Sequence, residues 1–344
     1  MDFLKCCFCF ASSIGCRDFV SRKLGFHPPD PPGYKLSGSE QLKIVLVDDT
    51  GAVIEPLSVP WVDLKIEILR TKRNQSIPVV FLKNIHARFT VIYSHGNSTD
   101  LGLVLNSLID LCLQLKVNIL VYEYTGYGLS TGKASEKNLY SDIETAYEYL
   151  KKQNVHWSTV ILYGQSLGSG PTCDLASKHP VGGVILHSPI ASGLHLFSNM
   201  LLKTPKYDLF PNVNKVPYIK CPVFIIHGTQ DDVVPVRHGE WLTELLHFSW
   251  PPWWVSGSGH NNIETNRRKE YLCKLKEFIQ AIEELTELGS TEDELLTIFK
   301  PLDLDLDSSK LPPRLLNWPS SKVKPFSAVN SPKKRSFRRQ TSVL

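Results

Sequence analysis

TVILYGQSLGSG, residues 159–170, is the stretch that decides the fold class of this 344-residue chain. It places Gly164-x-Ser166-x-Gly168 directly after an apolar run that predicts a buried strand and before a segment that predicts a helix. A serine on such a tight strand-to-helix turn exposes its Oγ at the top of a sheet, and only small residues two positions to either side avoid clashes there. The helix N-terminus behind the turn adds free N–H groups and the positive end of a dipole. The stretch therefore predicts a nucleophilic Ser166 on an α/β fold.

Two later segments provide an acid and a base for this serine. A hydroxyl is a poor nucleophile until a base removes its proton, and a turn of this kind is followed along the chain by an acid and then a histidine. CPVFIIHGTQDD puts Asp231 just past a predicted strand, and VSGSGHNN puts His260 in a glycine-rich loop. Asp232 is the competing acid, and Asp231 is preferred because it lies nearer the strand end. The sequence predicts a triad of Ser166, Asp231 and His260.

Stabilising the oxyanion of such a reaction requires two backbone donors. One is expected to be the amide of Leu167, which follows the nucleophile. The other is expected from the loop after the predicted strand in TVIYSHGN, where Asn97 is preferred and Ser98 is the second choice. His95 and Gly96 let that loop pass close to the substrate carbonyl.

No metal or cofactor is expected. Cys6, Cys7 and Cys9 lie too close together for a zinc site and lack a distant pair of ligands. The glycines of EYTGYGLSTG are one residue off the dinucleotide-binding fingerprint, and no acidic residue ends a following strand, so they predict a turn near the site. His95 and His227 precede glycines at strand ends and are predicted to be structural.

Apolar runs alternate with amphipathic segments through the middle of the chain. The alternation predicts strands at 41–47, 62–70 and 77–82 as an antiparallel opening, and further strands in RFTVIYSHGN, NILVYEY, TVILYG, VGGVILHSP and CPVFIIHG. Helices are predicted at 101–115, 138–152, 172–177, 238–247 and 266–285. Strands alternating with helices indicate an α/β fold with a mostly parallel central sheet and helices on both faces. We expect residues 41–288 to form this catalytic domain.

Composition and charge exclude several classes of protein. An apolar fraction of 42% and a charged fraction of 21% are ordinary for a globular protein. The net charge of +4 provides no global field for nucleic acid, and no apolar run reaches the ~18 residues of a membrane span. Four of the eight cysteines are scattered singly through apolar segments, which favours buried thiols in a reducing cytosol: Cys112, Cys173, Cys221 and Cys273.

Two flanking regions differ in composition from this domain. FHPPDPPGY begins a proline-rich connector over residues 26–40, which is predicted to be stiff and extended. Residues 289–344, acidic at first and then basic, predict a disordered tail with a short helix at 292–299. Within the tail, KKRSFRRQT suits a basophilic kinase and the final SVL matches a ligand of PDZ domains, and a solvated basic tail is the alternative.

The first ten residues, MDFLKCCFCF, leave several interpretations open. A secretory signal peptide is disfavoured because Lys5 breaks the apolar run and Asp2 stands where positive charge is expected. Disulfides between these cysteines are disfavoured because they form in oxidising compartments and not in a reducing cytosol. A metal site is disfavoured because the cysteines lack further ligands. Asp2 also excludes N-myristoylation, which requires glycine at that position. Attachment of lipid to the cysteines is the remaining interpretation of residues 1–25.

The chain resembles the α/β-hydrolase domain-containing protein 17 family in six segments: YSHGNSTDLG, YEYTGYGLSTGKASEKNLYSDIE, ILYGQSLGSGPT, LHSPIASG, CPVFIIHGTQDDVV and GSGHNNIE. The resemblance covers most of residues 26–285 and includes the cysteine-rich start and the proline connector. Members of that family are serine hydrolases on the cytosolic side of membranes, where they remove palmitate from cysteine thioesters of membrane proteins. The long tail after Leu288 departs from the family pattern.

This resemblance implies an α/β-hydrolase fold and a palmitoyl-protein thioesterase, without a cofactor, that acts on palmitoylated membrane proteins. It implies a lipid anchor at the cytoplasmic face of plasma or endosomal membranes. The residues that it implies are Ser166 as nucleophile, Asp231 as acid, His260 as base, and Cys6, Cys7 and Cys9 as palmitoylated anchors. A lysophospholipase or monoacylglycerol lipase would use the same triad. A non-catalytic membrane scaffold is an alternative of a different class.

Overall fold

The structure, a computed structural model, describes residues 25–38, 41–48, 50–197 and 208–288. The predicted lipid-anchor cysteines Cys6, Cys7 and Cys9 lie outside the described residues, as do the predicted tail at 289–344 and its short helix. In the described ranges, no helix combines the length and the apolar character needed to cross a membrane.

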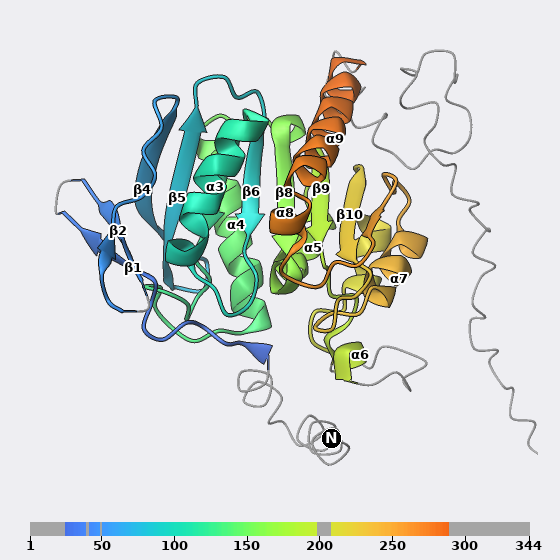
Figure 1. The fold of residues 1–344 in the computed structure, drawn as a ribbon, viewed down its shortest axis with the longest axis horizontal. Coiled ribbons are helices and arrows are strands. Elements are labelled where there is room, and N and C mark those ends of the chain that lie inside the picture. Colours follow the sequence, from blue (N-terminus) through green and yellow to red (C-terminus); the bar gives the residue numbers. More distant parts are fainter. Residues whose placement is uncertain (1–24, 39–40, 49, 198–207, 289–344) are drawn as a thin grey trace, which may run out of the picture.

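An eight-stranded sheet forms the centre of the described domain (Figure 1). Its strands follow the order β11-β10-β9-β8-β6-β7-β5-β4, in which the neighbours from β11 to β7 are parallel. β5 pairs antiparallel with both β7 and β4. The strands are β4 (Val62–Arg70), β5 (Ser76–Asn84), β6 (Thr90–Ser94), β7 (Asn118–Tyr122), β8 (Val160–Gln165), β9 (Gly183–His187), β10 (Val223–Gly228) and β11 (Trp253–Val255). The predicted mostly parallel sheet is confirmed, and of the three strands predicted as its antiparallel opening, those at 62–70 and 77–82 belong to it as β4 and β5.

The inner strands are apolar along nearly their whole length because both of their faces are covered. β6, β9 and β10 are buried at every position, and β8 is buried at all but its last, as expected for parallel strands between two helical layers. The edge strand β4 instead exposes the charged side chains of Asp63, Lys65 and Arg70. Charges on an edge strand disfavour pairing with another chain.

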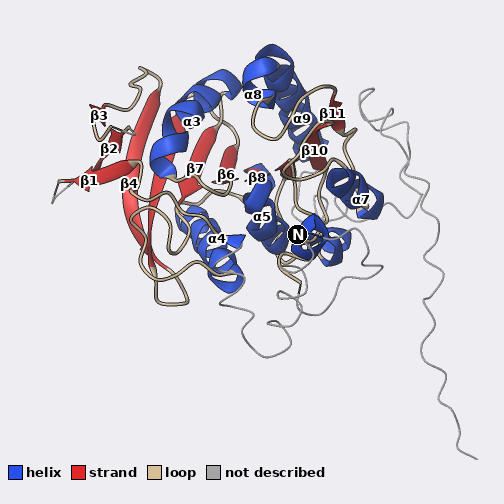
Figure 2. Cartoon of the chain, turned by 60° about the horizontal axis from the view of Figure 1, so that its bottom comes forward, coloured by secondary structure: helices blue, strands red, loops and turns tan. Residues whose placement is uncertain are grey.

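Helices cover both faces of the sheet (Figure 2). α3, α8 and α9 lie on one face, and α4, α5 and α7 lie on the other. The helices are α3 (Leu101–Leu115), α4 (Glu136–Lys152), α5 (Ser169–Ala176), α6 (Gly193–Phe197), α7 (Arg237–Leu245), α8 (Ile263–Asn266) and α9 (Arg268–Leu288). Short 3-10 turns are η1 (Trp157–Thr159), η2 (Ser166–Gly168), η3 (Asn212–Asn214) and η4 (Val216–Tyr218). The layering is that of the predicted α/β-hydrolase fold.

Two helices begin earlier than the apolar spacing predicts. α4 begins at Glu136 and not at Asn138, because Ser135 caps it by accepting a hydrogen bond from the Asn138 N–H at 3.3 Å. α5 begins at Ser169 and not at residue 172, because the turn at Ser166 leads directly into it through η2. All of α5 is buried, so it has no polar face from which its start could be seen in the sequence.

A second, three-stranded sheet lies beyond β4 (Figure 1) and corrects the prediction for the connector. It consists of β1 (Tyr34–Ser37), β2 (Lys43–Val47) and β3 (Val53–Ile54). The strand predicted at 41–47 therefore lies in this sheet and not in the central one. The connector predicted at 26–40 contains β1, and its Phe26 and Tyr34 are only 5% and 1% exposed. The prediction was wrong because the proline content indicates only local stiffness. It does not indicate the contacts that these residues make with distant parts of the chain.

Candidate active site

Ser166 lies in the turn between β8 and α5. Its φ of 51° is a left-handed conformation, which costs a residue other than glycine about 1–3 kcal/mol and persists only where its surroundings enforce it. Gly164 permits this turn, since a Cβ there would lie 2.5 Å from Thr172 Oγ1. Gly168 is equally confined, since a Cβ there would lie 2.9 Å from the His95 carbonyl oxygen. The structure thus places Ser166 on the strained strand-to-helix turn that the sequence predicts.

His260 connects Ser166 with Asp231. The His260 Nε2 lies 2.9 Å from Ser166 Oγ, and its Nδ1 lies 2.7 Å from Asp231 Oδ2. The two partners follow the carboxyl ends of parallel strands, Ser166 after β8 and Asp231 after β10, and His260 lies in the loop between β11 and α8. Asp232 is exposed. The structure brings the three predicted side chains into one hydrogen-bonded chain, in which Asp231 contacts His260.

The Asp231 carboxylate is fully buried and held by several donors. Its Oδ1 accepts the backbone N–H groups of Val233 at 3.0 Å and Val234 at 2.7 Å. Its Oδ2 lies 3.3 Å from His227 Nε2 in addition to the contact with His260. Burial by itself raises the pKa of Asp231, but these hydrogen bonds and the proximity of His260 outweigh it and hold the pKa well below its usual range. Asp231 is therefore an ionised partner for His260.

His227, which the sequence predicts to be structural, contacts the loop that carries Asp231. It is fully buried at the end of β10, and its Nε2 lies 2.7 Å from the Val234 carbonyl oxygen. The same nitrogen faces Asp231 Oδ2. His227 thereby fixes the loop that carries the acid and makes no contact with Ser166.

The loop after β6 lies beside Ser166. A Cβ on Gly96 would lie 4.0 Å from Ser166 Cβ, and Asn97 follows directly. Leu167, next to the serine in η2, is buried. In the described part of the chain, the Asn97 N–H donates to no backbone carbonyl. Both residues predicted as oxyanion donors therefore lie beside the serine.

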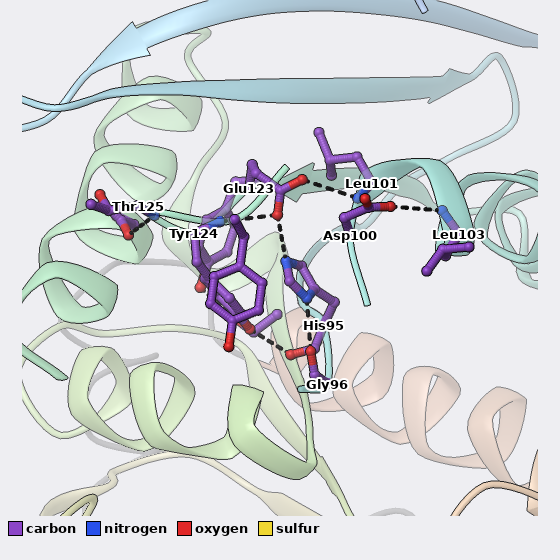
Figure 3. Close-up of polar contacts among 12 residues, drawn as sticks. His95, Gly96, Asp100, Leu101, Leu103, Glu123, Tyr124 and Thr125 are labelled. Carbon is purple, nitrogen blue, oxygen red and sulfur yellow. Dashed lines mark hydrogen bonds and ion pairs between the residues drawn. The ribbon is translucent and has the colours of Figure 1, made fainter. Parts of the chain in front are cut away.

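A buried pair of side chains holds the base of this loop (Figure 3). His95 Nε2 lies 3.0 Å from Glu123 Oε1, and both side chains are fully buried. The second oxygen of Glu123 accepts the Leu101 N–H at the start of α3, at 3.1 Å. His95 Nδ1 contacts the Gly96 carbonyl at 2.9 Å. A satisfied polar network in a buried setting is rigid, so this pair ties the loop to β7 and α3, in line with the structural role predicted for His95.

The glycine-rich segment EYTGYGLSTG forms the turns between β7 and α4, as predicted. All three of its glycines have positive φ values: 84° at Gly126, 47° at Gly128 and 81° at Gly132. Within the ranges that the structure covers, no group of three or more His, Cys, Asp or Glu side chains could hold a metal ion.

Solved structures share this fold. The esterase Pf2001 from Pyrococcus furiosus superposes with a TM-score of 0.53 at 20% identity, covering 65% of this chain and 97% of that one. Est1E from Butyrivibrio proteoclasticus, solved with ferulic acid, superposes with a TM-score of 0.53 at 16% identity, covering 62% and 98%. At such identities, the likeness shows the fold alone.

Sequence relatives are more specific. A family model described as Chlamydia CHLPS protein (DUF818) matches residues 76–181. The Caenorhabditis elegans alpha/beta hydrolase domain-containing protein aho-3 is 40% identical over 278 residues, which cover 80% of each chain. The human alpha/beta hydrolase domain-containing protein 17B is 37% identical over 278 residues, which cover 80% of this chain and 95% of the human one. The chain belongs to the alpha/beta hydrolase domain-containing protein 17 family. Family and fold together support a hydrolase activity.

In this member of the alpha/beta hydrolase domain-containing protein 17 family, sequence reasoning missed three residues around the loop after β6. Glu123 binds His95, Tyr127 Oη donates to Asn97 Oδ1 at 2.6 Å, and the His27 N–H donates to the same oxygen at 2.9 Å. One signal was present, since Glu123 in NILVYEY directly follows β7, and an acid at the carboxyl end of a parallel strand borders the site. Nothing in the sequence singles out His27 or Tyr127, because the residue that both contact, Asn97, lies 70 positions from His27 and 30 positions from Tyr127.

Proposed function

We propose that the chain is a serine hydrolase that cleaves the thioester of S-palmitoylated cysteines on membrane-associated proteins. The observation that carries the proposal is the hydrogen-bonded chain from Asp231 through His260 to Ser166, with distances of 2.7 Å and 2.9 Å. A nucleophile, a base and an acid that orients the base are the parts that acyl transfer by serine requires.

The proposed reaction has two halves. His260 Nε2 takes the Ser166 proton as Oγ attacks the thioester carbonyl carbon, and the amides of Leu167 and Asn97 hold the oxyanion. The carbon–sulfur bond then breaks, and the cysteine sulfur leaves with the proton from His260. Water, deprotonated by His260, attacks the acyl-serine, and the fatty acid leaves as the Ser166 hydroxyl is restored. Asp231 keeps His260 in the orientation and tautomer that these transfers need.

The site of action is proposed to be the cytoplasmic face of a plasma or endosomal membrane. Palmitate on Cys6, Cys7 and Cys9 would hold the enzyme there. One acyl chain alone gives membrane affinity of only ~10⁴ M⁻¹, so stable anchoring takes a second chain or nearby basic residues. Lys5 and Arg17 lie close to these cysteines in the sequence. The anchor and the substrate would then carry the same chemical group.

The proposal is tested by assaying the purified chain for hydrolysis of three substrates: a palmitoylated peptide thioester, a monoacylglycerol and a lysophospholipid. Ser166→Ala is expected to lower thioester turnover by roughly 10⁴-fold or more. Ser177→Ala is the matched control, because its Oγ donates only to Asp174 O at the end of α5, and it is expected to retain full turnover.

Three results would contradict the proposal. Normal thioester turnover by Ser166→Ala would remove Ser166 from the mechanism. Hydrolysis of the glycerolipids without hydrolysis of the thioester would assign the triad to a lipase. Failure of a fluorophosphonate probe to label Ser166 in the wild-type chain, together with no turnover, would favour a non-catalytic scaffold.

A further inference from the structure

Residues 25–34, here called the N-terminal strap, lie against the loop after β6. One end of the strap is fastened near the start of α3. There the Gly33 N–H donates to Asp100 Oδ2 at 2.7 Å, and Tyr34 Oη donates to Glu123 Oε2 at 3.1 Å, both in buried surroundings. Figure 3 shows Asp100 and Glu123 beside His95, the residue that begins the loop. The strap is thus bound to the same buried network that holds the loop.

The other end of the strap binds the Asn97 side chain. Asn97 Oδ1 accepts hydrogen bonds from the His27 N–H at 2.9 Å and from Tyr127 Oη at 2.6 Å. Asn97 Nδ2 donates to the Gly25 carbonyl at 3.1 Å and lies 3.1 Å from His27 Nδ1. A primary amide has two donor hydrogens and two acceptor lone pairs, so all four positions are engaged. The side chain is held by the strap and Tyr127 and has no polar capacity left for a substrate.

We propose that the strap and Tyr127 are positioning elements of the oxyanion hole, which act by fixing the Asn97 side chain and thereby aiming its backbone N–H. This inference rests on the proposed function and adds residues to that same site. An oxyanion donor stabilises the transition state only when it is held in advance at hydrogen-bond distance from the developing charge. Asn97 is half-buried between the buried Gly96 and the exposed Ser98. The left-handed φ of 55° at Ser98 persists only where the surroundings enforce it, and the bonds to the Asn97 side chain are part of those surroundings.

The location of these hydrogen bonds indicates that they position the Asn97 amide more than they stabilise the folded domain. His27 is exposed, Asn97 is half-buried and Tyr127 is fully buried. Water replaces the hydrogen bonds of the first two groups when they are lost, and phenylalanine in place of Tyr127 leaves no polar atom on that side chain. A Cβ on Gly96, the neighbour of Asn97, would lie 4.0 Å from Ser166 Cβ. Four polar contacts converge on one half-exposed side chain at the edge of the site. Their loss should displace the Asn97 amide while leaving the folded domain nearly as stable.

Three variants of the full-length chain test this role. His27→Pro removes the N–H that Asn97 Oδ1 accepts, and His27→Ala keeps that N–H while it removes the ring. Tyr127→Phe removes the hydroxyl that donates to Asn97 Oδ1 and that also accepts the His27 N–H at 3.2 Å. Tyr147→Phe is the matched control, because its hydroxyl donates to the Pro180 carbonyl at 2.9 Å and lies on α4, outside the network described above.

The measurements are kcat and KM for p-nitrophenyl butyrate, the melting temperature, and hydrogen exchange of a peptide spanning residues 95–99. We expect His27→Pro and Tyr127→Phe to lower kcat about 10- to 100-fold, less than the loss of an oxyanion donor itself, with KM within about 2-fold. Exchange of residues 95–99 should accelerate in both variants. His27→Ala should lose less activity than His27→Pro, and Tyr147→Phe should match the wild type in every measurement.

The outcomes separate this inference from the proposed function. An active wild type whose kcat and loop exchange are unchanged by Tyr127→Phe and His27→Pro would overturn the positioning role alone. A KM increase at constant kcat would also overturn it, because the strap would then contact the substrate. A wild type inactive on esters and thioesters would overturn the proposed function, and loop exchange would still report whether the strap holds Asn97. If His27→Pro does not fold, the kcat and loop exchange of Tyr127→Phe decide whether the positioning role holds.

Discussion

A Cβ atom on Gly168 would lie 2.1 Å from the backbone oxygen of Ser94. The last residue of β6 and the turn after β8 are therefore in direct backbone contact. This contact sets the distance between the loop that carries Asn97 and the serine at position 166. Any side chain at 168 must push β6 and the nucleophile turn apart.

Gly168→Ala is expected to lower the free energy of unfolding by about 1–3 kcal/mol, because the added methyl overpacks a backbone contact that has no flexible side chain to yield. Urea denaturation measures the loss. Gly259→Ala is the control, since the nearest atom to a Cβ there is 3.7 Å away. Equal stability of the two variants would show that the contact between Gly168 and Ser94 relaxes freely.

Asp231→Asn is expected to lower kcat by about 10³- to 10⁴-fold, because an amide cannot hold His260 in the tautomer that accepts a proton from serine. Steady-state kinetics on the thioester measures this effect. The neighbouring Asp232→Asn is the matched control, because Asp232 is exposed and makes no contact with His260. A loss of less than ten-fold in Asp231→Asn, or an equal loss in both variants, would contradict the assignment of the acid.

The buried Asp142 predicts a pH-dependent stability. Burial raises the pKa of Asp142 to about 7, although hydrogen bonds from the Thr125 N–H at 2.7 Å and Oγ1 at 2.8 Å oppose the shift. In the unfolded chain the pKa is about 3.9, so between about pH 4 and pH 7 the folded state binds more protons. The free energy of unfolding therefore falls as the pH rises through this range.

Asp142→Asn removes this titration. Its free energy of unfolding, relative to that of the wild type, should rise by about 2–4 kcal/mol between pH 4 and pH 7. Denaturant titrations at half-unit pH intervals measure the difference. Parallel stability curves for the two chains would mean that Asp142 titrates alike in the folded and unfolded states.

Asp100 serves a helix and the strap at once. Its Oδ1 accepts the Leu103 N–H at 3.1 Å as the N-cap of α3, and its Oδ2 accepts the buried Gly33 N–H at 2.7 Å. Asp100→Ala is expected to cost about 2–4 kcal/mol of stability, because it removes a cap and leaves a buried donor unpaired. Ser135→Ala, which removes only the cap of α4, should cost about 1 kcal/mol. Thermal denaturation compares the two variants. Equal losses of stability would show that the hydrogen bond from Gly33 to Asp100 makes no net contribution to stability.

Several features of the site could be predicted from the sequence because they depend on neighbours along the chain. The turn at Ser166 was predictable since strand, glycines and helix follow one another within twelve residues. The choice between Asp231 and Asp232 was harder. Both follow β10, and the sequence favours Asp231 only as the acid nearer the strand end. The packing of His260, 29 residues away from Asp231, distinguishes the buried acid from the exposed one. The early start of α5 was not visible, because a helix buried on all sides has no polar periodicity.

The sequence by itself determined most of the strands and helices, the mostly parallel sheet and the order of Ser166, Asp231 and His260, since period and local turn chemistry are properties of adjacent residues. Only the tertiary structure decided that residues 26–38 fold onto the domain, that β2 belongs to a separate small sheet, and that His27 and Tyr127 hold Asn97. The physical reason is the length of these connections. A hydrogen bond between His27 and Asn97 joins residues 70 positions apart. The packing of the whole chain brings these two residues together, and nothing in the sequence near either residue indicates the contact.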